Sequence, residues 1–173
     1  MPCDGTTLAH PQMDIREADP ADARAVSEVR QLRALDFPSA DALLRLRGRL
    51  DILMPVARVD TEIVGFALAA LVAAEEGRLG TVRYLFALVD EGPVAWASTA
   101  ALLSRLEQQC RAFDTDEIQL SAEHSAGFLE QLGPSGYRPH DSVADSFFSA
   151  GPGPRLLKRL NAVRPIWDTS GSA

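Results

Sequence analysis

The hydrophobic period of the sequence changes twice between residues 55 and 123, and this order of periods limits the fold more than any other feature. Residues 55–59, 63–73 and 81–89 have the composition of β-strands, whereas residues 94–113 repeat apolar positions every three or four residues, as an α-helix does. Residues 117–123 return to alternation. The compact turn Asp60-Thr61-Glu62 predicts that the first two strands form an antiparallel hairpin.

The long helix lies between two strands and carries the chain back. Strands 81–89 and 117–123 are therefore predicted to be parallel neighbours. A strand at 13–17 and two helices, from Pro20 and from Ala40 to about Leu50, precede this unit; a helix at 125–132 and one or two strands in 137–150 follow it. The order predicts an α+β fold: a mixed, mostly antiparallel central sheet of six or seven strands with flanking helices.

The two ends of the chain have a different composition. Residues 1–12 contain two prolines and show little periodicity, so we expect a disordered leader before a domain at 13–150. Residues 151–173 begin with a Gly- and Pro-rich stretch, and we expect a short amphipathic helix in "PRLLKRLNAV". Within the long helix, the expected buried stripe is Trp96, Ala100, Leu103, Leu106, Cys110 and Phe113.

Charge and composition exclude some classes of partner. The formal net charge is -7 and the two cysteines, Cys3 and Cys110, lie in very different settings. The acidity argues against nucleic-acid binding and against adhesion to an anionic membrane, and no apolar run approaches the roughly 18 residues of a membrane span. Two such cysteines do not make a disulfide framework, so we expect a cytoplasmic protein. No cluster of His, Cys and acidic residues has the spacing of a metal site.

Four segments, in order, resemble the GCN5-related N-acetyltransferase (GNAT) family. "MDIREADPADARAVSEV" is similar to the family's first strand and helix, and "VARVDTEIVGFALAALV" resembles its second hairpin. "LVDEGPVAWASTAALLSRLEQQCRAF" occupies the place of its acetyl-CoA motif, and "AGFLEQLGPSGYRP" resembles its segment with a Gly-Phe pair. The resemblance covers roughly residues 13–150 and implies the acyl-CoA N-acyltransferase fold.

The resemblance implies a function as well as a fold. It implies transfer of an acetyl group from acetyl-CoA to an amine of a small molecule or peptide. The strand before the long helix would pair with the pantetheine arm, and the helix N-terminus would present free N–H groups to the pyrophosphate. The implied cofactor-binding residues are Leu88, Val89, Val94, Ala95, Ala97, Ser98 and Thr99.

The sequence departs from the family at this motif. Where the family has Gln or Arg, this chain has Val94. At the two positions where the family has small residues, chiefly glycine, this chain has Ala97 and Thr99. Pro93 is suited to the first turn of a helix. If the helix begins there, the N–H groups near Ala97 are used within the helix. If it begins near Ser98, the hydroxyls of Ser98 and Thr99 replace part of what the glycines supply.

The catalytic residues also depart from the family pattern. Leu129 stands where the family has the tyrosine that acts as general acid. Tyr137 aligns better with the phenylalanine of the family's Gly-Phe pair than with that tyrosine, and we expect it in the core. Glu91, Glu123 and His124 are candidates for the general base, and Glu123 and His124 follow a strand where the family's cleft opens. We take Glu123 and His124 as the candidate catalytic pair.

Two other functions fit these departures. One is a pseudoenzyme with the same fold and weakened cofactor binding, which serves as a binding or dimerisation domain. The other is a partner-docking role of the tail, in which Leu156, Leu157, Leu160 and Val163 form an apolar face. Packing of that face on the protein's own sheet, or on the second copy in a homodimer, remains open at this stage.

Overall fold

A computed structural model of the chain describes residues 12–29, 37–74, 77–89, 92–121, 132–140 and 155–160. Eight strands form one sheet in the order β1-β3-β4-β5-β6-β8-β7, with β2 paired to β4. The strands are β1 (Met13–Glu17), β2 (Ile52–Leu53), β3 (Pro55–Val59), β4 (Glu62–Ala74), β5 (Gly77–Ala87), β6 (Glu117–Ser121), β7 (Arg138–His140) and β8 (Arg155–Arg159). The predicted mixed sheet with flanking helices is confirmed, with more strands than expected.

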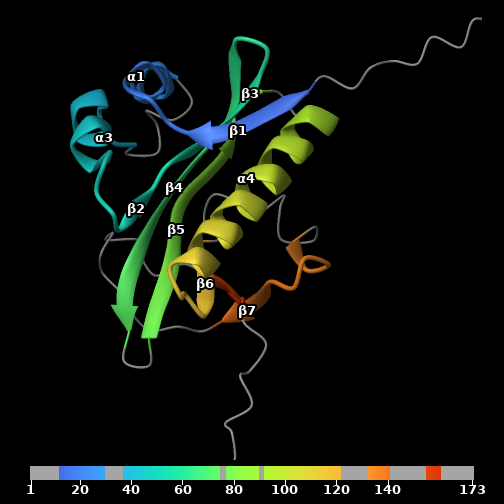
Figure 1. The fold of residues 1–173 in the computed structure, drawn as a ribbon. Helices are drawn as coiled ribbons and strands as arrows, with labels where there is room; N and C mark the ends of the chain where they lie inside the picture. The colour runs from blue at the N-terminus through green and yellow to red at the C-terminus, as the bar shows by residue number, and fades with distance from the viewer. Residues whose placement is uncertain are drawn as a thin grey trace, which may run out of the picture.

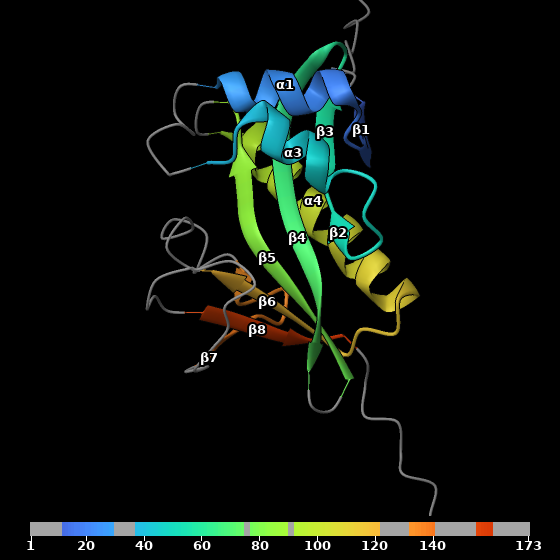
Figure 2. The same ribbon diagram turned by 90° about the vertical axis from the view of Figure 1, so that its left-hand side faces the viewer.

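Three described helices cover the two faces of this sheet. Helix α4 (Pro93–Ala112) crosses one face, whereas α1 (Pro20–Glu28) and α3 (Ala40–Leu46) lie together on the other (Figures 1 and 2). The described part of the chain contains no helix that is long and apolar enough to cross a membrane.

The start of α1 agrees with its sequence signals. Asp19 accepts hydrogen bonds from the backbone N–H groups of Ala21 and Asp22, and Asp22 accepts one from the backbone of Asp19 in return. The backbone N–H of Asp22 is the largest cause that lowers the pKa of the Asp19 carboxyl. With Pro20 at the first helical position, this reciprocal cap fixes where the helix begins.

Helix α3 is shorter than the sequence suggests. It was expected to run to about Leu50, but it ends at Leu46 because Gly48 adopts a left-handed conformation with φ 86°. A glycine in this conformation directly after the cap residue is a common helix stop. Leu50 therefore lies beyond the helix and is 85% exposed.

Strand β5 begins earlier than expected. The expected strand bounds of 63–73 and 81–89 are too short, because β4 continues to Ala74, β5 starts at Gly77, and the two strands pair as far as Ala74↔Gly77. The predicted hairpin of β3 and β4 is confirmed, with the turn at Asp60 and Thr61. The predicted parallel pair is also confirmed as β5 and β6.

The C-terminal element is a strand and not a helix. Residues 155–159 form β8 between β6 and β7, so the predicted amphipathic helix in this stretch is wrong over the described residues. Tertiary pairing on both edges overrides the helical spacing of the leucines. Leu156 and Leu160 are buried in the chain's own core, which removes them from any face that docks on another protein.

The buried face of α4 is rotated from the predicted stripe. Leu103, Leu106 and Cys110 are buried as expected, but Ala100 and Phe113 are exposed. Ser98, Thr99, Leu102 and Glu107 are buried in addition. The helix sits close to the sheet because the sheet has glycines beneath it: a Cβ at Gly80 would lie 2.7 Å from the Cys110 Sγ.

Several predictions fall outside the described residues. These are the leader, except Gln12, the helix at 125–132, except Leu132, the strand expected in 141–150, and the end of the tail from residue 161.

Candidate cofactor and acceptor site

The site begins where β5 and β6 stop pairing. Their parallel pairing runs from Leu79↔Glu117 to Val82↔Leu120, whereas β5 continues to Ala87. Pairing with β4 continues along this whole second half of β5. The C-terminal half of β5 therefore has a strand partner on one edge, and no described strand pairs with its other edge.

The backbone hydrogen bonds show which groups face that open edge. The N–H of Leu88 donates to the Val64 carbonyl of β4 at 2.9 Å. Because backbone groups of successive strand residues point to opposite edges, those of Leu85 and Ala87 face away from β4, toward the side of β6. The prediction named Leu88 and Val89 here. The register of the sheet adds that the backbone groups of Leu85 and Ala87 face the open edge, whereas those of Leu88 face β4.

Helix α4 begins at the earlier of the two expected positions. Gly92 is the N-cap in an extended conformation, Pro93 is the first helical residue, and the Trp96 N–H donates to the Gly92 carbonyl at 3.2 Å. The N–H groups of Val94 and Ala95 precede the first residue that can bond within the helix. Among the described residues, no side chain caps this end.

The two hydroxyls that a helix start near Ser98 would have offered to the phosphate lie inside the helix. Ser98 Oγ and Thr99 Oγ1 both donate to the Ala95 carbonyl, at 2.8 and 3.0 Å, and their residues are 0% and 1% exposed. Their hydroxyl protons are thus used within the first turns. Ala97, between Ala95 and this pair, is exposed.

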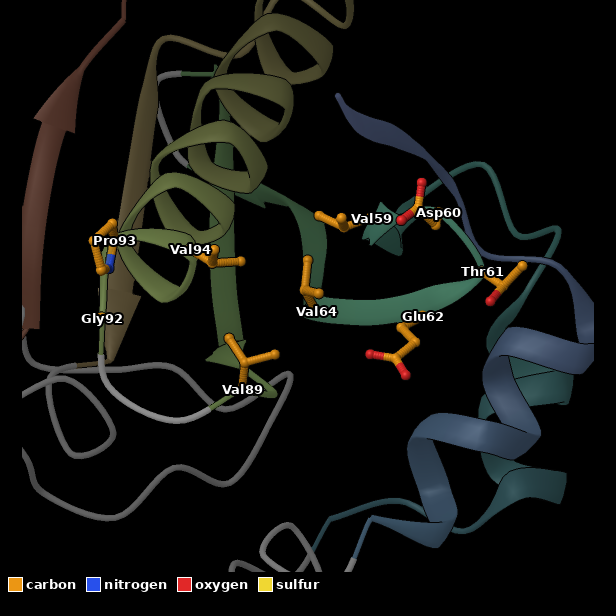
Figure 3. A pocket seen from close by; sticks show the side chains of 9 residues that line it. All are labelled: Val59, Asp60, Thr61, Glu62, Val64, Val89, Gly92, Pro93 and Val94. Carbon is orange, nitrogen blue, oxygen red and sulfur yellow. The ribbon is translucent and has the colours of Figure 1, made fainter. Parts of the chain in front are cut away.

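A hollow of about 640 Å³ lies beside the first turn of α4, on the side of the β3–β4 hairpin (Figure 3). Its apolar wall comes from four valines and Pro93, and its rim carries the acidic side chains Asp60 and Glu62. The valines are Val59, Val64, Val89 and Val94. Val94 is 37% exposed, so its side chain presents methyl groups where the family has an amide or a guanidinium.

This part of the structure suits an anion through backbone groups alone. The uncapped N–H groups of Val94 and Ala95 and the positive end of the helix dipole are what a pyrophosphate needs at a helix start. None of the described residues that line the hollow is basic, and two of them are acidic. The described lining thus offers an anion backbone N–H groups and no basic side chain.

Other candidate residues lie away from the site or outside the described part of the chain. Glu91, Glu123 and His124 fall outside the described residues. Tyr137 is 1% exposed and donates its hydroxyl to Glu107 at 2.9 Å, which agrees with its expected core position. Cys110 is a buried free thiol, as predicted. The described residues contain no group of three His, Cys, Asp or Glu side chains that suits a metal ion.

Trp96 is half-buried, and not fully in the core as expected. It lines a second hollow of about 450 Å³ on α4, together with Thr99, Glu107 and Lys158. Glu107 is held there by the Lys158 ammonium, at 2.8 Å from both carboxylate oxygens, and by Arg111 at 3.3 Å. The polar groups of this cluster satisfy one another and join α4 to β8.

No protein-family model matches the sequence, and no curated protein matches it either. Solved structures do match in three dimensions. A GNAT-family acetyltransferase of Staphylococcus aureus MU50 is 13% identical with a TM-score of 0.69, covering 87% of this chain and 100% of its own. The PaiA N-acetyltransferase of Thermoplasma acidophilum, in complex with coenzyme A, is 18% identical with a TM-score of 0.63, covering 86% and 99%.

YncA of Salmonella typhimurium, with its cofactor acetyl-CoA, is also 18% identical with a TM-score of 0.63, covering 86% of this chain and 94% of its own. The similarity in each case extends over nearly the whole of both chains. At these identities it establishes the arrangement of the backbone and not the chemistry. The chain has the fold of the GNAT acetyltransferases, the family that its sequence motifs resemble.

Proposed function

We propose that this protein is an acetyl-CoA-dependent N-acetyltransferase that acts on an amine of a small molecule or peptide in the cytoplasm. The observation that carries the proposal is the continuity of two features. The open edge of β5 leads, within a few residues, to the uncapped start of α4. An extended ligand with amide groups at one end and a pyrophosphate at the other matches this order of backbone groups.

The described residues have separate roles in this proposal. The backbone N–H groups of Val94 and Ala95 would hold the pyrophosphate, and the backbone of Leu85 and Ala87 would bond the amides of the pantetheine arm. Ala97 keeps the outer surface of the first turns small, and Ser98 and Thr99 fix those turns from inside. When bound, acetyl-CoA supplies an activated acetyl thioester.

The amine must lose a proton before it attacks the acetyl carbonyl. Glu123 and His124 remain the proposed acid–base residues, since they follow β6 in the sequence at the end where β5 and β6 stop pairing. A histidine titrates close to neutral pH and is suited to this role.

A calorimetric titration tests the cofactor binding on which the proposal depends, and an assay of turnover tests the reaction. Titration of acetyl-CoA into the protein should give measurable heat and raise the melting temperature, and dephospho-CoA and pantetheine alone should bind progressively more weakly. An amine panel assayed for free coenzyme A release should then show turnover that Glu123→Gln or His124→Ala reduces. Absence of heat at millimolar acetyl-CoA would overturn the proposal.

A pseudoenzyme is the second candidate, and the hollow beside α4 favours it. Val94 replaces the phosphate-binding side chain, and Asp60 and Glu62 place negative charge near the helix start. Both features weaken the binding of an anion. Cofactor binding without turnover of any amine would favour this function, and size-exclusion chromatography with light scattering would then test the predicted homodimer.

A further inference from the structure

Another hollow, of about 460 Å³, lies between α1 and the ends of the central strands. It is on the opposite face of the sheet from α4. Its wall is mostly aliphatic: Ala25, Val26, Val29, Ile63, Leu88 and Val89. Thr61, Glu62 and Val89 line both this hollow and the one beside α4, so the two meet at the end of β5.

Two of the charged groups in this hollow are already paired. Asp22 is 2% exposed, and its carboxylate lies 2.7 Å from Arg16 Nη1 and 3.3 Å from Arg58 Nη1. Arg58 also donates to the Thr61 carbonyl at 2.6 Å, which ties the hairpin turn to α1. These bonds neutralise Asp22 and leave the Arg58 guanidinium engaged on two sides.

Glu62 is the carboxylate that remains. It is exposed at the start of β4, and its side chain has no hydrogen bond or ion pair with another residue in the described ranges. Figure 3 shows its side chain extending into the space between Val89 and α1. Among the described residues, the Glu62 carboxylate thus has no charged or hydrogen-bonding partner and stands beside an aliphatic wall.

We propose that this hollow binds the acceptor, and that Glu62 selects an acceptor with a cationic amine on an apolar body. The inference rests on the proposed function where it calls the bound amine an acceptor. Binding of the amine itself does not need the cofactor. A primary amine is protonated at neutral pH, so its charge complements Glu62, and its carbon skeleton lies against Val29 and Leu88. The paired Asp22 and Arg58 shape the pocket without adding net charge.

The test compares two probes of the same shape in the absence of acetyl-CoA. 2-Phenylethylamine is charged, and 2-phenylethanol is not. Binding is measured by chemical-shift titration of the ¹⁵N-labelled protein. The amine should bind about fivefold more tightly than the alcohol, as expected for one partly exposed charged contact, and its shifts should map to residues 25–29, 62–63 and 88–89.

The Glu62→Gln variant keeps the size of the side chain and removes its charge. In this variant the amine and the alcohol should bind equally, whereas Asp41→Asn, an exposed acid on α3, should retain the preference for the amine. Equal binding of the two probes to the wild type, binding of neither, or a preference that survives Glu62→Gln would overturn the inference. Failure of acetyl-CoA to bind would overturn the proposed function alone.

Discussion

Ser98 packs its Cβ directly against the backbone of Gly65, where α4 crosses β4. A Cβ built on Gly65 would lie 3.2 Å from the Ser98 Cβ, 3.2 Å from the Phe86 carbonyl and 2.9 Å from Leu102 Cδ1. This contact explains why Ser98 is fully buried and why Gly65 lies within the "IVGF" of β4. It also holds the start of the helix close to the end of β5.

Gly65→Ala should therefore destabilise the protein by about 1–3 kcal/mol, the usual cost of overpacking a core. The change is measured as the free energy of unfolding in urea. Ala97→Ser, on the exposed surface one residue before Ser98, should change it by less than about 0.5 kcal/mol. A Gly65→Ala protein as stable as the wild type would contradict the close approach of helix and sheet.

The affinity for acetyl-CoA should depend on the charge at position 94. Val94→Arg should tighten binding about twofold to fivefold and Val94→Asp should weaken it by a similar factor, because an exposed charge pair contributes roughly 0.2–1 kcal/mol. Both effects should shrink as salt is raised. Calorimetric titrations at two ionic strengths measure this, and Leu50→Arg, on the turn after α3, is the control. Identical affinities of all three variants would contradict a phosphate at this helix start.

The sequence predicted those parts of the fold that rest on local signals. The start of α1 at Pro20 and the turn at Asp60 each follow from a few neighbouring residues, and the parallel return of the chain after α4 follows from the order of strand, helix and strand. The strand β8 did not, because "RLLKR" satisfies helical spacing as well as alternation, and only the free edges of β6 and β7 decide between them.

The site was predictable in outline and not in detail. The position of Pro93 predicted a helix start at this residue as one of two alternatives, and the helix does begin there. This start places Ser98 and Thr99 inside the helix. The open edge of β5 depends on where two strands stop pairing, and sequence spacing carries no signal for it. The hollow beside α1 joins residues more than sixty positions apart, so only the folded chain brings Glu62 and Leu88 next to Val26.

Strand β8 should be essential for stability. Leu156 is 5% exposed and faces the core on the same side as Lys158, so Leu156→Ala should cost about 2–5 kcal/mol. Arg159→Gln removes only the exposed pair with Glu117 and should cost less than about 1 kcal/mol. Urea denaturation followed by circular dichroism measures both. Equal stabilities of these two variants would show that residues 155–159 do not form part of the sheet.

The ion pair between Lys158 and Glu107 joins β8 to α4 and should also contribute to the free energy of unfolding. Glu107 is 8% exposed, and Lys158→Met removes its closest cationic partner, so we expect a loss of about 1–3 kcal/mol. In a Glu107→Gln background, the same substitution should cost clearly less, because no buried charge is left unpaired. A double-mutant cycle in urea gives this difference. Equal costs in the two backgrounds would mean that the two side chains do not interact.

Stability should fall in alkaline solution because of Cys110. Burial, and then the negative charge of Glu107, raise the pKa of this thiol to about 11, from 9.0 in an ordinary setting. Between these pH values the unfolded chain loses the thiol proton and the native protein keeps it. The unfolded state then binds fewer protons, so the free energy of unfolding falls as pH rises, by at most about 1.4 kcal/mol per unit for one group.

Burial also raises the pKa of Tyr137, which contributes in the same direction at higher pH. Urea denaturation at pH 8, 9 and 10 should therefore show a decline in stability that Cys110→Ala reduces below pH 10. Tyr137→Phe should leave the decline between pH 8 and 9 unchanged, because an ordinary tyrosine is still protonated there. The sign is specific: a native thiolate stabilised by a nearby cation would make stability rise over the same interval. A Cys110→Ala protein with the wild-type slope would place this thiol in contact with solvent.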